Sequence, residues 1–324
     1  MTSTLPTLLV LADGTENQLR MLEPFRERVR IVIGPTLQSV ADAAPIADAL
    51  LIWTASRDLV QQVFAQTPRL RWVHSRSAGL DSLLFPALVD SPVPLTNSSG
   101  VYSRSLGEFV ALGVLFFAKD LHRMQRNQAA GRWAPYDVDM AEGKTMGIVG
   151  YGDIGRAAAR LAKGLGMHVI ALRRRPEQSQ GDPLVDEVMG NDRLHELMAR
   201  SDYVVVTAPL TPDTRGLVSA QAIAAMKPGA VMINVGRGAV IDEPALIDAL
   251  RQRRIRGAAL DVFAQEPLPD GHPMYGLDNL LLSPHCADHT LTWIDDAMVF
   301  FTDNLERFLR GEPLRNVVEK RLGY

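Results

Sequence analysis

The stretch Met146-Gly-Ile-Val-Gly-Tyr-Gly-Asp-Ile-Gly155 decides the fold of this chain. An apolar run of strand type passes directly into a Gly-x-Gly-x-x-Gly turn, and an alanine-rich helical segment follows. In this context Gly150 permits the tight turn, Gly152 lets the backbone approach a pyrophosphate, and Gly155 lets helix and strand pack closely. The helix N-terminus then offers N–H groups and a positive dipole end to the anion. We therefore predict a dinucleotide-binding βαβ unit here.

Short apolar runs alternate with helical patterns on both sides of this turn, which predicts parallel sheets. The strands expected in the second part of the chain are Thr145–Val149, His168–Leu172, Tyr203–Thr207, Ala230–Asn234, Gly257–Phe263 and Leu280–Ser283. Those expected in the first part are Thr7–Ala12, Arg30–Ile33, Ala49–Trp53, Leu70–His74 and Val93–Thr96, with no glycine-rich phosphate loop among them. We expect an α/β protein with a Rossmann-type doubly wound parallel sheet and a smaller flavodoxin-like α/β domain.

Two helical segments frame the dinucleotide domain. A largely apolar stretch from Ser105 to about Gly131 begins with Ser105-Leu-Gly-Glu108, which fits a capping box. The last helix, from about Thr292 to Arg310, ends at Gly311 with Pro313 behind it. Asp288 precedes this helix. We expect its side chain to cap the helix N-terminus, the alternative being that its charge acts on the neighbouring His285.

Composition excludes several classes of protein. The 324 residues suggest two domains at roughly 100–200 residues each, and 47% are hydrophobic. The formal charge is −3, so we expect no nucleic-acid partner. The run Phe109–Ala118 is too short to span a bilayer, and the apolar run Leu8–Ala12 does not resemble a signal peptide. A single cysteine, Cys286, cannot form an intrachain disulfide. We expect a cytoplasmic protein that does not bind membranes.

The end of the second strand of the dinucleotide unit indicates which cofactor binds. NAD-binding proteins carry a carboxylate there that binds the ribose 2′-hydroxyl. This chain has Arg173-Arg174-Arg175-Pro176 instead, and no carboxylate before Glu177. An arginine can pair with a 2′-phosphate, which a carboxylate would repel. We expect NADP(H) to be preferred, with NAD(H) possible. The alternative is a solvated basic turn without a ligand.

Three further residues follow expected strands: Arg237, Glu266 and His285. Ligands of open α/β sheets bind beyond the carboxyl ends of the strands, so we expect these side chains to share one crevice. The arginine can hold the carboxylate and carbonyl of a 2-oxo acid. The histidine can supply a proton to the developing alkoxide, and the glutamate would orient it and favour the imidazolium. The remaining histidines show no metal-ligand spacing, and we expect no metal.

With this dinucleotide turn and these residues after the strands, the chain resembles the D-isomer-specific 2-hydroxyacid dehydrogenases. The resemblance covers nearly the whole chain and is most specific between residues 147 and 285. The stretches that carry it, besides the dinucleotide turn, are Pro209–Thr214, Met226–Ala230, Ile233–Val240, Ala259–Phe263 with Glu266-Pro267, and Ser283-Pro-His285; weaker matches are Ala78–Asp81, Asn97–Gly100 and Asn316–Val318.

The resemblance implies roles for particular residues. It implies Arg237, Glu266 and His285 as the catalytic set, and Ser77, Ala78 and Gly79 as a loop that binds the substrate together with Arg237 and His285. The cofactor-binding residues that we expect are Gly150, Gly152, Asp153, Ile154, Gly155, Arg173, Arg174, Thr207, Ala208, Pro209, Thr214, Val235, Gly236, Arg237, Asp261 and His285. The side-chain pocket for the substrate would lie near Trp53–Ala55, Ser77–Leu80 and Tyr102.

The resemblance also implies the domain order and a partner. The substrate-binding (catalytic) domain would consist of residues 1–99 and 290–324, and the dinucleotide-binding domain of residues 100–289. A homodimer joined through the dinucleotide domain is expected. The arginines at 173–175 resemble those of NADPH-preferring glyoxylate/hydroxypyruvate reductases, so the expected activity is hydride transfer between NADP(H) and a small 2-oxo or D-2-hydroxy acid. The alternatives are a phosphite- or formate-type anion dehydrogenase and a non-enzymatic, corepressor-like nucleotide sensor.

Overall fold

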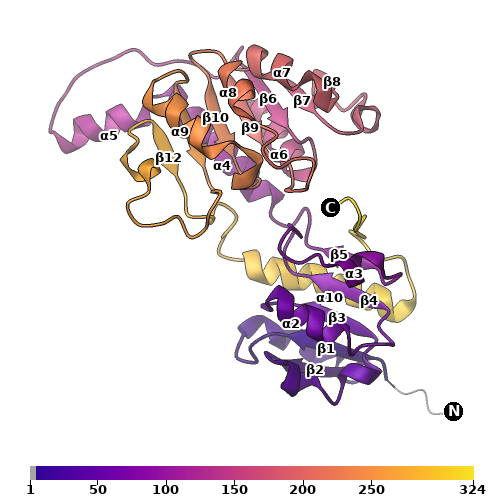
Figure 1. Cartoon of the computed structure of the whole chain (residues 1–324). Coiled ribbons are helices and arrows are strands. Elements are labelled where there is room, and N and C mark those ends of the chain that lie inside the picture. The colour runs from indigo at the N-terminus through magenta and orange to yellow at the C-terminus, as the bar shows by residue number, and fades with distance from the viewer. Residues whose placement is uncertain (1–4) are drawn as a thin grey trace. The chain divides into compact units, whose positions relative to one another are not determined.

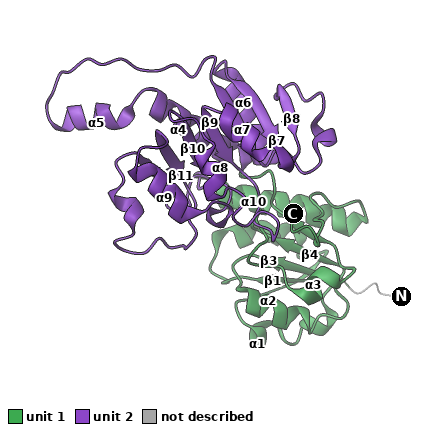
Figure 2. Ribbon diagram, turned by 45° about the horizontal axis from the view of Figure 1, so that its top comes forward, with its two compact units in different colours: residues 1–102, 291–324 green, residues 103–290 purple. Residues whose placement is uncertain are grey.

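A computed structural model of the chain describes residues 5–324. The chain folds into two compact units (Figure 2). Unit 1 comprises Met1–Tyr102 with Leu291–Tyr324, and unit 2 comprises Ser103–Thr290. The domain boundaries predicted from the sequence lay after residue 99 and before residue 290. The final helix therefore belongs to the same unit as the beginning of the chain.

Unit 1 is built on five parallel strands in the order β2-β1-β3-β4-β5, the order of flavodoxin-like sheets (Figure 1). The predicted smaller flavodoxin-like domain is confirmed. The strands are β1 (Thr7–Leu11), β2 (Arg30–Gly34), β3 (Ala49–Ile52), β4 (Trp72–Ser75) and β5 (Leu95–Asn97). The helical segments are η1 (Asn17–Phe25), α1 (Leu37–Val40), η2 (Ala44–Ile46), α2 (Arg57–Phe64), α3 (Pro86–Asp90) and α10 (Trp293–Arg310).

Helix α10 completes the core of unit 1. Phe301 is fully buried and stacks on Trp72 of β4, with ring centres 5.3 Å apart. The helix ends at Gly311, whose φ of 68° no other residue type adopts as readily. The predicted stop at this glycine is confirmed. Because the sheet is covered on this side by a helix from the far end of the chain, unit 1 is discontinuous in sequence.

Unit 2 contains seven parallel strands in the order β12-β11-β10-β9-β6-β7-β8, the doubly wound arrangement predicted from the dinucleotide turn (Figure 1). The strands are β6 (Thr145–Val149), β7 (His168–Leu172), β8 (Glu187–Met189), β9 (Tyr203–Val206), β10 (Val231–Asn234), β11 (Gly257–Leu260) and β12 (Leu280–Leu282). Strand β8 was not predicted, since its three residues carry too little apolar pattern. The strand order reverses between β6 and β9, and ligands of such sheets bind at this switch point.

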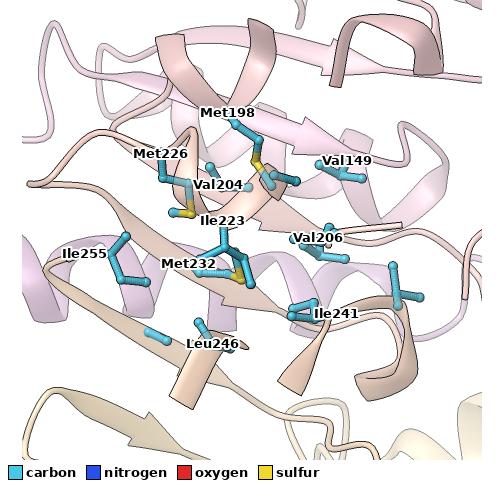
Figure 3. Packing of buried hydrophobic residues seen from close by; sticks show 14 of the residues in the cluster. Val149, Met198, Val204, Val206, Ile223, Met226, Met232, Ile241, Leu246 and Ile255 are labelled. Atoms are coloured by element: carbon cyan, nitrogen blue, oxygen red, sulfur yellow. The ribbon is translucent and has the colours of Figure 1, made fainter. Parts of the chain in front are cut away.

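Helices cover both faces of the larger sheet. The helical segments of unit 2 are α4 (Ser103–Ala118), α5 (Leu121–Ala129), α6 (Asp153–Gly164), η3 (Pro176–Ser179), η4 (Asn191–Arg193), α7 (Leu194–Arg200), α8 (Ala220–Ala224), η5 (Gly238–Val240), α9 (Glu243–Arg251) and η6 (Pro273–Gly276), and α5 buries none of its residues. Figure 3 shows Ile223, Met226 and Met232 clustered in the core, where α7, α8 and α9 contribute apolar side chains against the strands. This core supports the strands whose carboxyl ends carry the candidate site.

The segment predicted as one helix from Ser105 to Gly131 is two helices. Helix α4 begins at Ser103, and the predicted capping box is wrong, because the Ser105 hydroxyl donates to the carbonyl of Ala287 at 2.6 Å. Asp120 adopts a left-handed backbone (φ 50°), which ends α4, and its side chain accepts from the N–H of Arg123 to cap α5. Across residues 5–324, no helix has the length and apolar character needed to cross a bilayer.

Candidate active site

The three predicted catalytic residues lie on loops at one edge of the larger sheet. Strands β10, β11 and β12 are neighbours and parallel, so their carboxyl ends lie at the same edge. Arg237 follows β10, Glu266 follows β11 and His285 follows β12. Backbone hydrogen bonds connect these loops: the N–H of Asp261 donates to Asn234 (3.0 Å), and that of His285 donates to Asp261 (2.9 Å). The sheet thus brings together residues far apart in sequence.

His285 and Glu266 form a close pair. The Nδ1 atom of His285 lies 2.6 Å from Oε2 of Glu266, whose other oxygen accepts from the N–H of Phe263 at 2.9 Å. The glutamate is therefore held from its own loop while it orients the imidazole. The His285 side chain is 41% exposed, and its Nε2 atom contacts no hydrogen-bond partner among residues 5–324. An imidazole fixed through one nitrogen and open at the other can pass a proton to a bound ligand.

The turn that carries His285 is held by Asp261. His285 has a φ of 52°, a left-handed conformation that costs energy for a residue with a Cβ. The Asp261 side chain is buried, and its Oδ1 atom accepts hydrogen bonds from Ser283 Oγ (2.7 Å), Cys286 N–H (2.9 Å) and Ala287 N–H (3.1 Å). These three hydrogen bonds stabilise the left-handed conformation of the turn. Sequence analysis placed Asp261 only against the cofactor and missed this part of its role.

Asp288 does not cap the last helix. Helix α10 begins at Trp293 after Thr292, and no side chain caps it. The carboxyl of Asp288 is largely buried and lies 3.7 Å from Nε2 of His289. Burial raises the pKa of Asp288, while the nearby charges of His289 and His285 act to lower it. The capping prediction is therefore wrong, and the alternative, that the charge of Asp288 acts on His285, stays a prediction.

Arg237 lies on a turn that is closed by Asn234. This buried side chain accepts from the N–H of Gly236 (3.0 Å) and donates to the carbonyl of Arg237 (3.1 Å). A Cβ atom at Gly236 would lie 2.8 Å from the carbonyl oxygen of Ala208, so the turn packs directly against the loop after β9. The Arg237 Nη1 atom donates to the Gly236 carbonyl at 2.9 Å. Sequence analysis missed Asn234, although a polar residue ending an apolar strand was a usable signal.

The three glycines of the dinucleotide turn have separate structural reasons. Gly150 has a φ of 99°, and a Cβ atom there would lie 2.6 Å from the backbone of Ala208. A Cβ atom at Gly155 would lie 2.9 Å from the Gly150 carbonyl, so helix and strand pack closely at this position. A Cβ atom at Gly152 would meet no described atom within 4 Å. The turn is thus tight where it packs and open at Gly152, which fits close approach of a pyrophosphate.

The surroundings of the turn also fit a dinucleotide. Asp153 and Ile154 form the first turn of α6, whose N-cap Gly152 provides no side-chain cap. The Thr207 hydroxyl donates to the Gly150 carbonyl, so the loop after β9 lies against the turn. Thr214 acts within that loop, because its hydroxyl donates to the carbonyl of Pro209 at 2.6 Å. Ala208, Val235 and Gly236 occupy the same edge of the sheet, after β9 and β10.

A cavity of about 470 Å³ opens at the end of β7. Arg173 lines it and donates to the Ser179 hydroxyl and to Gln178 Oε1 (2.9 Å), so this guanidinium is held in place. Asp182 lines it too, but its carboxylate accepts from Arg156 Nε and from the Tyr151 hydroxyl, both at 3.0 Å. Burial and the nearby carboxylate raise the pKa of Tyr151. Arg174, next along the chain, is exposed.

In unit 1 the predicted substrate loop Ser77–Gly79 follows β4. Two side chains hydrogen-bond to backbone carbonyls of this segment and fix its conformation. Tyr102 Oη donates to the Arg76 carbonyl (2.9 Å), and Asn97 Nδ2 donates to the Ala78 carbonyl (2.7 Å). The backbone N–H groups of Ser77, Ala78 and Gly79 donate to no other residue of the described chain. Successive unpaired N–H groups form an anion-binding site. Sequence analysis missed that Asn97 supports this loop.

Among residues 5–324, no three His, Cys, Asp or Glu side chains come together as a metal site. The polar groups described above are of the kinds that can bind a nucleotide and an organic anion.

Comparison with known proteins agrees with this geometry. The sequence model of one family, described as "D-isomer specific 2-hydroxyacid dehydrogenase, NAD binding domain", matches residues 112–287, more than half of the chain. The chain belongs to this family.

Relatives of this dehydrogenase differ in the substrates for which they are named. This chain is 31% identical to a glyoxylate reductase of Thermococcus onnurineus, and the match covers 98% of this chain and 97% of the relative. It is 30% identical to D-3-phosphoglycerate dehydrogenase of Methanocaldococcus jannaschii over 96% of this chain, but spans only 59% of that longer protein. A solved dehydrogenase of the same family from Xanthobacter autotrophicus Py2, in complex with NADPH and MES, has a TM-score of 0.83 and 33% identity, covering 99% of this chain and all of that one.

Proposed function

We propose that this protein is an NADP(H)-dependent reductase of small 2-oxo acids, equivalently a D-2-hydroxyacid dehydrogenase, with glyoxylate and hydroxypyruvate as the simplest substrates. The observation that carries the proposal is the pair of His285 and Glu266, with Nδ1 and Oε2 2.6 Å apart, on the sheet edge that also carries Arg237 and the dinucleotide turn. A proton donor, a cation and a nucleotide site on one edge are what carbonyl reduction requires.

Each residue has a distinct role in the proposed reaction. The Arg237 guanidinium binds the substrate's carboxylate and polarises its carbonyl, and the N–H groups of Ser77–Gly79 bind the carboxylate. Bound NADPH would supply the hydride. His285 donates a proton from Nε2 to the carbonyl oxygen during reduction and accepts it during oxidation. Glu266 orients the ring through Nδ1 and stabilises the positive charge of the imidazolium.

The cavity at the end of β7 supports NADPH over NADH. Two carboxylates line it: Asp182, which accepts hydrogen bonds from Arg156 and Tyr151, and Asp153, which begins α6 at the dinucleotide turn and does not follow β7. Arg173, held by Gln178 and Ser179, is left as the cation that faces the same space. A 2′-phosphate supplies the negative charge that this cation lacks. Arg174 would add to the attraction.

A homodimer joined through unit 2 is the second part of the proposal. Leu112 and Leu115 are 46% and 39% exposed on the largely apolar helix α4, and Trp133 is 97% exposed. Figure 2 shows α5 and the following segment standing off from the body of unit 2. Light scattering should give twice the chain mass. Leu115→Arg should give monomers, whereas Val299→Arg, at an exposed apolar position on α10 of unit 1, should leave the dimer intact.

The activity is tested by the decrease of the reduced-nicotinamide absorbance. NADPH and NADH are each paired with glyoxylate, hydroxypyruvate, pyruvate and phenylpyruvate. We expect NADPH oxidation with at least one acid, and much slower reaction with NADH. Faster reaction with NADH would contradict the assignment of Arg173. If no acid reacts while NADPH still binds, the reductase proposal is overturned, and phosphite, formate and a sensor role are examined next.

His285→Ala and Arg237→Ala should each lower kcat by at least about 10²–10⁴-fold, the contribution of general acid catalysis, while NADPH still binds. Loss of cofactor binding in both variants would mean that these residues do not act on the substrate.

A further inference from the structure

Arg76 occupies an unusual position between β4 and the Ser77–Gly79 loop. Its guanidinium carbon lies 5.1 Å from the ring centre of Trp53 and 5.7 Å from that of Trp293. Contact with aromatic rings holds a guanidinium in place and leaves its N–H groups available in the plane. Trp53 follows β3 and Trp293 begins α10, so the framework around Arg76 comes from three separate parts of unit 1.

The N–H donors of Arg76 are not used within the described chain. Its guanidinium makes no hydrogen bond to another residue between 5 and 324 and lies within 4.0 Å of no carboxylate there. By contrast, Arg315 contacts the ring of Phe300 but also pairs with Asp303 at 3.1 Å. A cation that is partly buried without a counter-charge is suited to receive an anion.

The carboxylate in this cluster is Glu16, and it is engaged elsewhere. One of its oxygens accepts from the indole N–H of Trp53, and the other accepts from the Thr54 hydroxyl at 2.9 Å. Glu16 therefore fixes the ring on which Arg76 lies and does not neutralise the arginine.

The Arg76 side chain and the unpaired N–H groups belong to one rigid framework. Tyr102 donates to the Arg76 carbonyl at 2.9 Å, and its ring centre lies 6.2 Å from that of Trp293. The same tyrosine thus fixes both the loop that presents the N–H groups of residues 77–79 and the aromatic surroundings of the cation. The Arg76 guanidinium and the N–H groups of residues 77–79 are therefore held by shared contacts.

We propose that Arg76 binds a second anionic group of the substrate, so that the enzyme prefers 2-oxo acids with a carboxylate, sulfonate or phosphate at the end away from the reacting carbonyl. This rests on the proposed function and narrows its substrate class. The N–H groups of Ser77–Gly79 bind the carboxylate next to the carbonyl. The planar guanidinium of Arg76 binds the second anionic group through two parallel, charge-assisted hydrogen bonds. A lysine would bring the charge without the planar fork.

The first test compares oxaloacetate with pyruvate, which differ by one carboxylate. We expect the wild type to have the higher kcat/KM for oxaloacetate. Arg76→Met should lower kcat/KM for oxaloacetate by about 10- to 100-fold and change it for pyruvate by less than about threefold, as expected for loss of one charge-assisted hydrogen-bonded pair. Arg76→Lys should fall between the two. Preference of the wild type for pyruvate, or an equal loss with both acids in Arg76→Met, would overturn the proposal.

Arg71→Met is the matched control. Arg71 precedes the same strand β4 at its other end and contacts the ring of Phe308 at 5.0 Å. Its substitution also removes a cation from an aromatic ring in unit 1, but away from the substrate loop. Neither substrate should be affected by it. An equal loss with oxaloacetate in Arg71→Met and Arg76→Met would show that the charge of unit 1 matters and not the position of Arg76.

A binding measurement separates this proposal from the reductase proposal. D-malate and D-lactate are titrated calorimetrically in the presence of NADPH, where neither can be oxidised. D-malate should bind at least about tenfold more tightly to the wild type and to Arg71→Met, and with no preference to Arg76→Met. That result would stand even if no 2-oxo acid were reduced, in which case the proposed function alone fails. A wild type without preference for D-malate overturns the role of Arg76 whatever its turnover.

Discussion

Glu266 and His285 are joined by a contact of 2.6 Å between Oε2 and Nδ1, although their loops follow different strands. A contact this short is a hydrogen bond in which Nδ1–H donates to the glutamate oxygen. Its geometry depends on the Glu266 backbone loop, through Phe263, and on the left-handed turn at His285 that Asp261 holds. The pair is therefore a product of the sheet edge and not of local sequence.

Replacing Glu266 by Gln should separate orientation from charge. The amide can still accept from the N–H of Phe263, but it no longer stabilises a positive imidazole. We expect kcat for reduction to fall about 100-fold, within the range of general acid catalysis, and the rate to decline with rising pH from a lower pH than in the wild type. Steady-state rates between pH 5 and 9 measure both. NADPH affinity should stay within about twofold, and an unchanged pH profile would contradict the charge role.

Alanine substitutions at Gly155 and Gly152 should affect different properties: the first should lower the stability of unit 2, and the second should weaken NADPH binding. A Cβ atom at Gly155 would lie 2.9 Å from the Gly150 carbonyl and 3.0 Å from Ile148, so Gly155→Ala should destabilise unit 2 by about 1–3 kcal/mol. A Cβ atom at Gly152 meets no described atom within 4 Å, so Gly152→Ala should leave stability nearly unchanged and weaken NADPH binding. Thermal unfolding and cofactor titration measure the two effects. Tight NADPH binding by Gly152→Ala would argue against a pyrophosphate at this turn.

Substitution of the arginines after β7 should discriminate between the cofactors. We expect Arg173→Ala with Arg174→Ala to raise KM for NADPH by about 10- to 100-fold, because charge-assisted pairs with the 2′-phosphate are lost. KM for NADH should change less than about threefold. Arg175→Ala is the control, since this exposed residue precedes η3 in the same basic run. Equal losses with both cofactors would mean that neither arginine contacts the phosphate.

His74 should make unit 1 sensitive to acid. Burial lowers the pKa of His74 to about 3, while the unfolded chain protonates it near its ordinary value of about 6.5. Between these values the unfolded state binds the extra proton, so the free energy of unfolding falls as the pH falls, by up to about 1.4 kcal/mol per pH unit. From pH 7 to pH 5 the wild type should lose about 2 kcal/mol through this residue.

His74→Gln removes this titration, so its stability deficit relative to the wild type should shrink by that amount at pH 5. Urea unfolding followed by tryptophan fluorescence is suitable, because Trp53, Trp72 and Trp293, three of the chain's four tryptophans, lie in unit 1. A deficit independent of pH would show that His74 is protonated equally in both states.

The fold was predictable because its signals are local. A strand that leads into Gly150-Tyr-Gly-Asp-Ile-Gly155 has few other structures available, since each glycine answers a backbone or packing requirement. The edge that carries Arg237, Glu266 and His285 was predictable for a related reason. Parallel strands align their carboxyl ends, so residues that follow β10, β11 and β12 must lie on one side. The structure also confirms the flavodoxin-like α/β domain that was expected for the first part of the chain.

What escaped prediction depends on contacts between distant residues. The interruption at Asp120 and the true surroundings of Asp288 are set by backbone conformation and burial, which apolar periodicity does not report. Strand β8 exists because β7 pairs with it, not because of its own three residues.

The sequence alone therefore determined the dinucleotide turn, the sheet type and the residues at the strand ends, because these follow from periodicity and from glycine's conformational range. Only the tertiary structure decided how those residues are held. Asp261 holds the His285 turn, Tyr102 and Asn97 bind the carbonyls of residues 76 and 78, and indoles from residues 53 and 293 hold Arg76. Each of these contacts joins segments that only folding brings within hydrogen-bonding or van der Waals distance.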